Sequence, residues 1–461
     1  MKLIVVILCL ASTAAAQTIG TQVDAELAKQ QAAVAAVAAD VAAVKKALPP
    51  ELPGVRELGE PIVIPRQTLK VPPPFMASAA ISPAGELGGV SPTQTILRFA
   101  PTIKGPLVSS EGFTDPKLGA WWNDGAAFTC FVPRVHDLAI DGRGELHPHP
   151  YLNAMGGQPD KTGPDAVARG DGVCLAGTGA IAERLRLFQI QGTALVVRGA
   201  PIAGQSGQFG LYDEAVARID DVSILQCING IDCNAGDARI SRVSVSQIAK
   251  DGLTVSGPGT YVSDAHVWGA DRSVVFGCEV HANAIYAEAA RIGCHLLSSA
   301  NGTTISGLNI GPSTCSSRGA LVEASCVSVS GLTGAISGPQ AVGCELAATT
   351  CEVSVAGRCH AYNGATACIV QGHRQTIRLN SQLAGDKSTA VKVVGPISNC
   401  VIELVGWGGA NTTALDLSQA ELGTGNEFHV RFSGVARRVI YPGDKNKLPA
   451  GNTLTIDGEK Q

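Results

Sequence analysis

Pairs of apolar residues separated by one outward-facing residue recur along most of the chain, and this recurrence restricts the fold more than any other feature. From Val222 onward, successive pairs begin 21, 22, 22, 21, 19, 26, 24, 25 and 26 residues apart. Alternate residues of a strand point to opposite faces, so each pair marks a strand with an apolar inner face. A nearly fixed period of such strands predicts a solenoid of stacked coils. The pairs are Leu138/Ile140, Leu185/Leu187, Val222/Ile224, Val243/Val245, Ala265/Val267, Ala287/Ala289, Leu308/Ile310, Val327/Val329, Val353/Val355, Ile377/Leu379, Ile402/Leu404 and Phe428/Val430.

A second short strand follows about nine residues after each pair begins, as at residues 231–233, 253–255 and 391–393. Cys233 falls in the same column as Val255 and Phe276, which predicts a buried packing thiol rather than a redox group. Only 4% of the residues are aromatic, so the core must be aliphatic. Leucine-rich and helical repeats are disfavoured because no coil contains a helical segment. The sequence predicts an all-β, parallel β-helix of about twelve coils over residues 127–461.

Residues 1–16 have the pattern of a secretory signal. Lys2 supplies the positive start, residues 3–12 the apolar stretch, and residues 14–16 the small-residue cleavage site. The apolar stretch is shorter than the ~20 residues needed to span a bilayer, and no later segment is apolar enough. We therefore expect a secreted or extracellular protein without a transmembrane segment.

Residues 17–48 follow a 4–3 apolar spacing that is typical of a coiled-coil helix. β-Branched residues at both seam positions favour three strands, so the segment predicts a homotrimer. The alternative is an amphipathic helix that docks on its own body. The seam residues are Val23, Leu27, Val34, Val37, Val41, Val44 and Leu48. Eight prolines between residues 49 and 75 predict an extended linker, and residues 76–126 a small β-rich shoulder.

Charge and cysteine content exclude several classes of function. A net charge of -4 and the absence of a basic stripe disfavour nucleic-acid binding. The 14 cysteines form no Cys-x-x-Cys pair, and His-Glu-x-x-His is absent, so neither zinc nor any other cofactor is predicted.

The segment Leu-Ala-Ile-Asp-Gly-Arg-Gly-Glu-Leu at residues 138–146 resembles the opening coil of the pectin-lyase-like, right-handed parallel β-helix superfamily. Together with the heptads, the arrangement also resembles trimeric phage tailspikes and tail fibres. The resemblance implies a right-handed β-helix and a tendency to bind carbohydrate. The Gly-Asp-Gly-x-x-Asp-Asp start of many tailspikes and the catalytic patterns of pectin-cleaving relatives are absent, so no catalytic residue carries over.

Stacked coils place equivalent outward residues side by side, and one such group is polar. We expect Asp264, His266 and Glu288 to be the candidate catalytic residues, because two carboxylates can support sugar hydrolysis and a histidine can remove a proton from a uronic acid. Asp221, Arg242, Tyr286 and Trp268 are the candidate glycan-binding residues. The alternative is a solvated face on which charges of opposite sign alternate to avoid repulsion.

These features predict a trimeric surface spike or fibre, carried on a virion or on a bacterial surface, that binds a cell-surface glycan or polysaccharide. The first alternative is a polysaccharide depolymerase, either a lyase or a glycoside hydrolase, of the same architecture. The second is an exported monomer that decorates a cell envelope. No complete catalytic signature decides between an enzyme and a binding protein.

Overall fold

The computed structural model describes residues 54–58, 61–64, 69–71, 86–99, 105–110, 113, 122–123, 128–130, 133–142, 170–177, 179–199, 217–313, 318–347, 350–443 and 447–461. These residues belong to one compact unit, Pro53–Gln461. The predicted signal peptide and heptad segment, residues 1–48, lie outside them. The named elements of the described ranges are all β-strands, and none of these ranges contains a helix long and apolar enough to cross a membrane.

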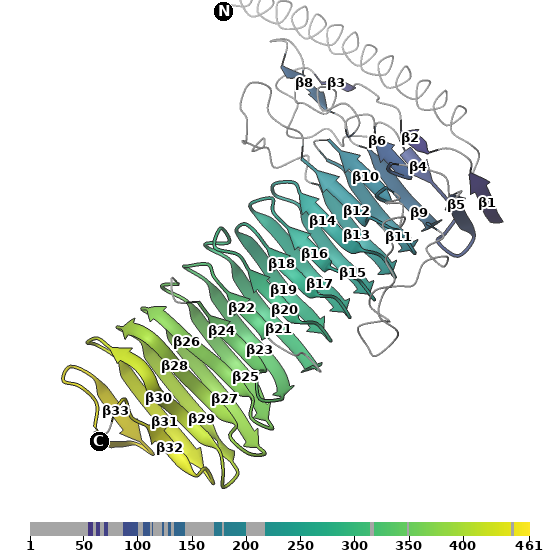
Figure 1. Cartoon of the computed structure of the whole chain (residues 1–461). Coiled ribbons are helices and arrows are strands. Elements are labelled where there is room, and N and C mark those ends of the chain that lie inside the picture. The colour runs from purple at the N-terminus through teal and green to yellow at the C-terminus, as the bar shows by residue number, and fades with distance from the viewer. Residues whose placement is uncertain are drawn as a thin grey trace, which may run out of the picture. The chain divides into compact units, whose positions relative to one another are not determined.

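Two long sheets form the body of the solenoid (Figure 1). The first sheet contains β1 (Gly54–Leu58), β4 (Glu86–Gly88), β5 (Thr95–Phe99), β9 (Arg134–Asp141), β11 (Ile181–Phe188), β13 (Arg218–Leu225), β15 (Arg239–Ser246), β17 (Thr260–Trp268), β19 (Val280–Glu288), β21 (Thr304–Ser313), β23 (Ser328–Ser337), β25 (Ser354–Tyr362), β27 (Thr376–Ala384), β29 (Val401–Gly408), β31 (Glu427–Ser433), β33 (Thr453–Ile456) and β34 (Glu459–Lys460).

The second sheet lies on another side of the same coils. It contains β2 (Ile62–Ile64), β6 (Val108–Ser110), β10 (Val173–Ala176), β12 (Thr193–Arg198), β14 (Asn229–Asn234), β16 (Asp251–Val255), β18 (Arg272–Phe276), β20 (Ile292–Leu296), β22 (Arg318–Val322), β24 (Val342–Leu346), β26 (Thr366–His373), β28 (Thr389–Ser398), β30 (Thr413–Leu422) and β32 (Arg437–Ile440). A small antiparallel sheet joins β3 (Leu69–Val71), β8 (Phe128–Cys130) and β7 (Trp122–Asn123).

Neighbouring coils pair in parallel and in register, which builds continuous aliphatic columns in the core. Val222, Val243, Ala265 and Ile285 form one such column, and all four are at most 2% exposed. A single coil cannot bury its apolar side, but each coil covers the one beneath it. The predicted parallel β-helix is confirmed. Cys233 is fully buried as predicted, and burial raises the pKa of its thiol to about 12.

The long strands of the first sheet bend at one residue that has left-handed backbone geometry. The bend falls at the same position in successive coils, which keeps the strands on both sides of it in register. Left-handed geometry is rare for residues other than glycine. The bend residues and their φ angles are Asp137 (56°), Arg184 (50°), Asp221 (55°), Arg242 (52°), Asp264 (53°), Ala284 (52°), Gly307 (79°) and Gly331 (67°).

The register corrects part of the predicted alignment. In β19 the pair that continues the column is Ile285 and Ala287, not Ala287 and Ala289. In β23, Val329 stacks on Ile305 and therefore belongs before the bend. The physical reason is that each long strand buries apolar residues on both sides of the bend, and spacing alone does not distinguish the two sets.

Strands at both ends extend the solenoid. Ile62 of β2 pairs with Val108 of β6, and Val108 pairs with Val173 of β10, all in parallel. Residues 49–75 and 76–126, predicted as a linker and a shoulder, thus supply strands to both sheets. At the other end, β34 folds back on β33 in the antiparallel sense.

Candidate functional site

Four aromatic or imidazole rings stand in two pairs on β17 and β19. Tyr261 lies opposite His281, with ring centroids 5.2 Å apart, and His266 lies opposite Tyr286, with ring centroids 5.9 Å apart. Tyr261 is 55% exposed and Tyr286 is 41% exposed. The bend at Asp264 separates the two pairs. We call Tyr261, His266, Trp268, His281 and Tyr286 the ring-lined face.

The structure brings together part of the predicted catalytic group. His266 Nε2 lies 3.4 Å from Glu288 Oε2, which is hydrogen-bonding distance. Glu288 is not directly opposite His266, however, but opposite Trp268. Asp264 corresponds to Ala284 on the next coil, four residues before Glu288, or about 13 Å along the strand. The two side chains are therefore offset along the sheet rather than directly opposite one another, and the pairing of Asp264 with Glu288 as two catalytic carboxylates stays a prediction.

Arg242 contacts a carboxylate that is not among the predicted site residues. Its guanidinium donates to both carboxylate oxygens of Asp220, at 3.1 and 2.6 Å, rather than to Asp221. Asp220 also accepts hydrogen bonds from Ser241 and Arg218. Burial raises the pKa of Asp220, but these hydrogen bonds outweigh it, and the net pKa is lowered. The Arg242 side chain is 61% exposed, so it still faces solvent.

A groove of about 670 Å³ lies on the first sheet toward the N-terminal coils. The loop at residues 91–93 forms one wall, and outward residues of β9, β11 and β13 form the rest, Asp137, Arg184 and Asp221 among them. Arg184 donates to both oxygens of Asp137, at 2.6 and 2.7 Å. The groove therefore contains the predicted residue Asp221 beside an ion pair that sequence reasoning did not identify.

One outward column connects the groove with the ring-lined face. The register aligns Arg186, Ser223, Ser244, His266 and Tyr286 on five consecutive strands, β11 to β19. Arg186 lines the groove and is exposed, and its side chain has no hydrogen bond or ion pair with a described residue. Four strand spacings of ~4.8 Å give this part of the column a length of about 19 Å.

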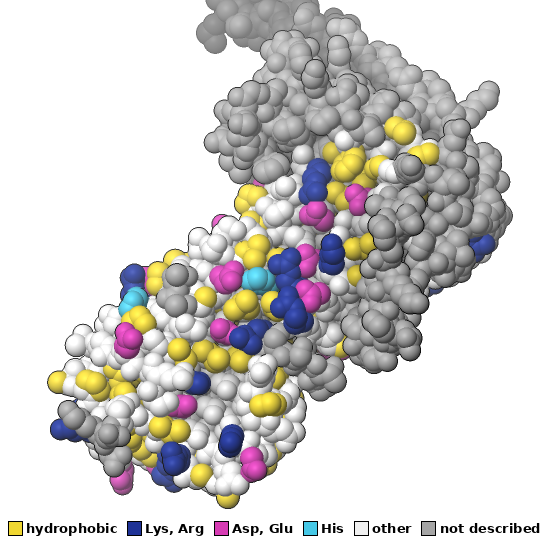
Figure 2. Space-filling model, viewed as in Figure 1, with side chains coloured by type: hydrophobic (Ala, Val, Ile, Leu, Met, Phe, Trp, Pro, Cys, Tyr) yellow, Lys and Arg dark blue, Asp and Glu magenta, His cyan; other side chains and the backbone are white. Residues whose placement is uncertain are grey.

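The remaining polar surface is of mixed sign. Figure 2 shows basic and acidic side chains interspersed over the face in view. Within the described ranges, no three His, Cys, Asp or Glu side chains gather in a way that could hold a metal ion.

Comparisons with known proteins identify no family. No family model matches the chain, and no curated protein matches it. Among solved structures, the chain is similar to the A-module of a mannuronan C-5 epimerase from Azotobacter vinelandii, with a TM-score of 0.39 and 12% sequence identity over 88% of each chain.

Proposed function

We propose that this protein is an exported β-helix protein that binds a polysaccharide along the first sheet. The observation that carries the proposal is the ring-lined face, where two ring pairs stand exposed on adjacent coils of a chain that is only 4% aromatic. Aromatic side chains with an apolar ring and a polar tip are suited to ligands that present both kinds of surface, as sugars do.

The heptad pattern of residues 17–48 supports assembly of three chains into a surface spike or fibre. Three copies of a weak site raise the avidity for a polymer without any new contact. Multi-angle light scattering of the mature protein should give three times the mass of one chain. A monomer at working concentration would remove the trimer from the proposal but leave the binding face untouched.

Binding itself is tested by affinity electrophoresis in gels that contain one of a panel of bacterial polysaccharides. The variant with both Tyr261→Ala and Tyr286→Ala should bind about tenfold more weakly, because each ring contact contributes roughly 0.5–1.5 kcal/mol. Tyr362→Ala on β25, outside the ring-lined face, is the matched control. Equal retardation of the double variant and the wild type would contradict the proposal.

A second candidate function, polysaccharide lyase activity, is favoured by the hydrogen bond between His266 and Glu288. A carboxylate that orients the imidazole would let His266 remove a proton adjacent to the carboxylate of a uronic acid. The bond from the next ring carbon to the glycosidic oxygen then breaks, that oxygen takes up the proton held by His266, and a carbon–carbon double bond forms in the sugar. Arg242, on the neighbouring strand β15, would have to exchange its pairing with Asp220 for the carboxylate of the sugar in order to neutralise it.

The ultraviolet absorbance of unsaturated uronates tests the lyase. The wild type should generate it from a bound uronate polymer, and His266→Gln should abolish it while retaining binding. If the wild type binds such a polymer but releases no unsaturated product, the lyase is excluded and the binding function stands.

A further inference from the structure

The outward column that contains His266 and Tyr286 does not end at β19. Parallel register continues it through Asn309, Thr333, Arg358, Asn380 and Val405 to Arg431 on β31. Together with Arg186, Ser223, Ser244, His266 and Tyr286, these residues form what we call the axial column. It spans eleven strands, or about 48 Å at ~4.8 Å per strand.

The axial column contains three arginines and no carboxylate. Arg186, Arg358 and Arg431 are exposed, and none of their side chains has a hydrogen bond or ion pair with a described residue. Arginines in neighbouring columns are used differently. Arg242 is held by Asp220, and Arg378 by Glu403 at 3.1 Å.

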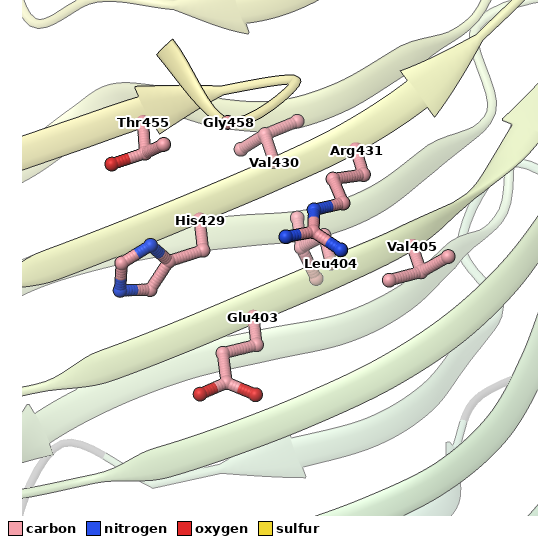
Figure 3. A pocket seen from close by; sticks show the side chains of 8 residues that line it. All are labelled: Glu403, Leu404, Val405, His429, Val430, Arg431, Thr455 and Gly458. Carbon is pink, nitrogen blue, oxygen red and sulfur yellow. The ribbon is translucent and has the colours of Figure 1, made fainter. Parts of the chain in front are cut away.

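The column ends in a pocket of about 320 Å³ at the C-terminal coils (Figure 3). Glu403, His429 and Thr455 face outward from β29, β31 and β33 in one row, and Val405 and Arg431 form the next row. The turn at Gly458, between β33 and β34, closes one side. In Figure 3 the Arg431 side chain extends from β31 toward β29.

Arg431 is the surplus cation of this pocket. Glu403 is the carboxylate among the residues that line the pocket, and it is paired with Arg378. Asp457, next to the turn, is paired with Arg438, and Glu427 does not line the pocket. Glu459, beyond the turn, lies on β34 and does not line the pocket. The guanidinium of Arg431 is therefore available for an anion from outside the chain.

Apolar surface adjoins this guanidinium. Val405 and Trp407 are 50% and 54% exposed, and alternation along β29 places them on the same face as Glu403. Val405 is directly opposite Arg431, and Trp407 is opposite Ser433, two residues further along β31. An exposed indole on the same face as this guanidinium suits a ligand that carries both a ring and a negative charge.

We propose that the axial column binds a linear anionic polysaccharide that runs parallel to the solenoid axis, with Arg186, Arg358 and Arg431 contacting its acidic groups and the C-terminal pocket holding one acidic sugar. The proposal rests on the proposed function and adds the charge, direction and length of the ligand. Arg358 lies seven strands from Arg186 and three from Arg431, or about 34 and 14 Å. Only an extended polymer reaches all three.

The test measures binding of the full-length protein to polygalacturonate, dextran sulfate and neutral dextran by biolayer interferometry at low and high salt. The variant with Arg358→Gln and Arg431→Gln should bind both anionic polymers about tenfold more weakly at low salt, because exposed charge pairs contribute at most ~1 kcal/mol each. Its salt dependence should be shallower than that of the wild type. Polygalacturonate and dextran sulfate distinguish carboxylate from sulfate as the acidic group.

Arg291→Gln is the matched control, since Arg291 lies outside the axial column and the pocket, has a 50% exposed side chain and is paired with Asp271. Its affinity should stay within twofold of the wild type. An equal loss in both variants would show nonspecific attraction to basic surface and overturn the proposal. So would tighter binding of single-stranded DNA than of either anionic polysaccharide. Binding of neutral dextran alone, sensitive to Tyr286→Ala, would overturn the anionic column while leaving the proposed function intact.

Discussion

Asp137 allows a direct test of how the charged network in the groove stabilises the N-terminal coils. Its carboxylate accepts two hydrogen bonds from Arg184 and lies 2.6 Å from His136 Nδ1. The hydrogen bond from Arg184 is the main cause that lowers the pKa of Asp137 from 3.8 to about 2. One pKa unit corresponds to about 1.4 kcal/mol, so the charged form stabilises the folded state by roughly 2.5 kcal/mol.

We therefore expect Asp137→Asn to destabilise the coils at β9 and β11 by about 2 kcal/mol at pH 7. Asparagine keeps the size of the side chain and tolerates the left-handed geometry at this bend, so only the charge is lost. Because the folded-state pKa is the lower one, the stabilisation is complete above pH 3.8 and disappears as the pH falls through 2. The difference between variant and wild type should shrink over that window.

Hydrogen exchange resolved to individual strands is the suitable assay, because a solenoid can open coil by coil. Asp221→Asn is the matched control. Asp221 occupies the equivalent bend of β13 with φ 55°, and its side chain has no ion pair with a described residue. Asp221→Asn should therefore lower the local stability by less than about 0.5 kcal/mol. Equal losses of stability in the two variants would refute the reasoning. So would a stability difference between Asp137→Asn and the wild type that is as large at pH 2 as at pH 7.

Three further changes have defined outcomes. Phe428→Ala removes a fully buried ring and should lower the free energy of unfolding by about 3–5 kcal/mol, measured by urea denaturation, whereas Trp407→Ala should cost little. Ala284→Gly relieves left-handed geometry at φ 52° and should raise the melting temperature slightly, and a decrease would contradict the assigned bend. Among the cysteines whose surroundings the structure describes, exposed Cys326 should react first with iodoacetamide. Glu352→Gln should accelerate this reaction, because the hydrogen bond to Glu352 raises the thiol pKa and so reduces the reactive thiolate.

The fold was predictable because its signal is local and repeated. Alternating apolar residues such as Val243 and Val245 identify a strand, and their recurrence identifies the stack. The register was only partly predictable. The bend that divides each long strand is occupied by Asp264 in one coil, Ala284 in the next and Gly307 in the third, so no residue type marks it.

The candidate site, like the register, was predictable only in part. Alternation correctly placed His266 and Tyr286 on the outer face. Tyr261 was missed, although continuing the alternation back from buried Val262 would have found it. The loop at residues 91–93 and the ion pair of Arg184 with Asp137 were beyond sequence reasoning, because they join segments more than 40 residues apart.

The second sheet shows what a purely solvated face of this solenoid looks like, and the axial column differs from it. At the start of the second sheet's strands, Arg272 of β18 pairs with Asp251 of β16. One coil further, Arg291, just before β20, pairs with Asp271, just before β18. Opposite charges on neighbouring coils attract, whereas like charges stacked one strand apart repel.

A face selected only for solubility should therefore alternate in sign. The axial column instead keeps Arg186, Arg358 and Arg431 several coils apart, with uncharged or ring side chains between them and no acidic neighbour in the column. The spacing avoids repulsion among the arginines without neutralising them. Positive charge is thus preserved along the axis, which is the property that a linear anionic ligand requires.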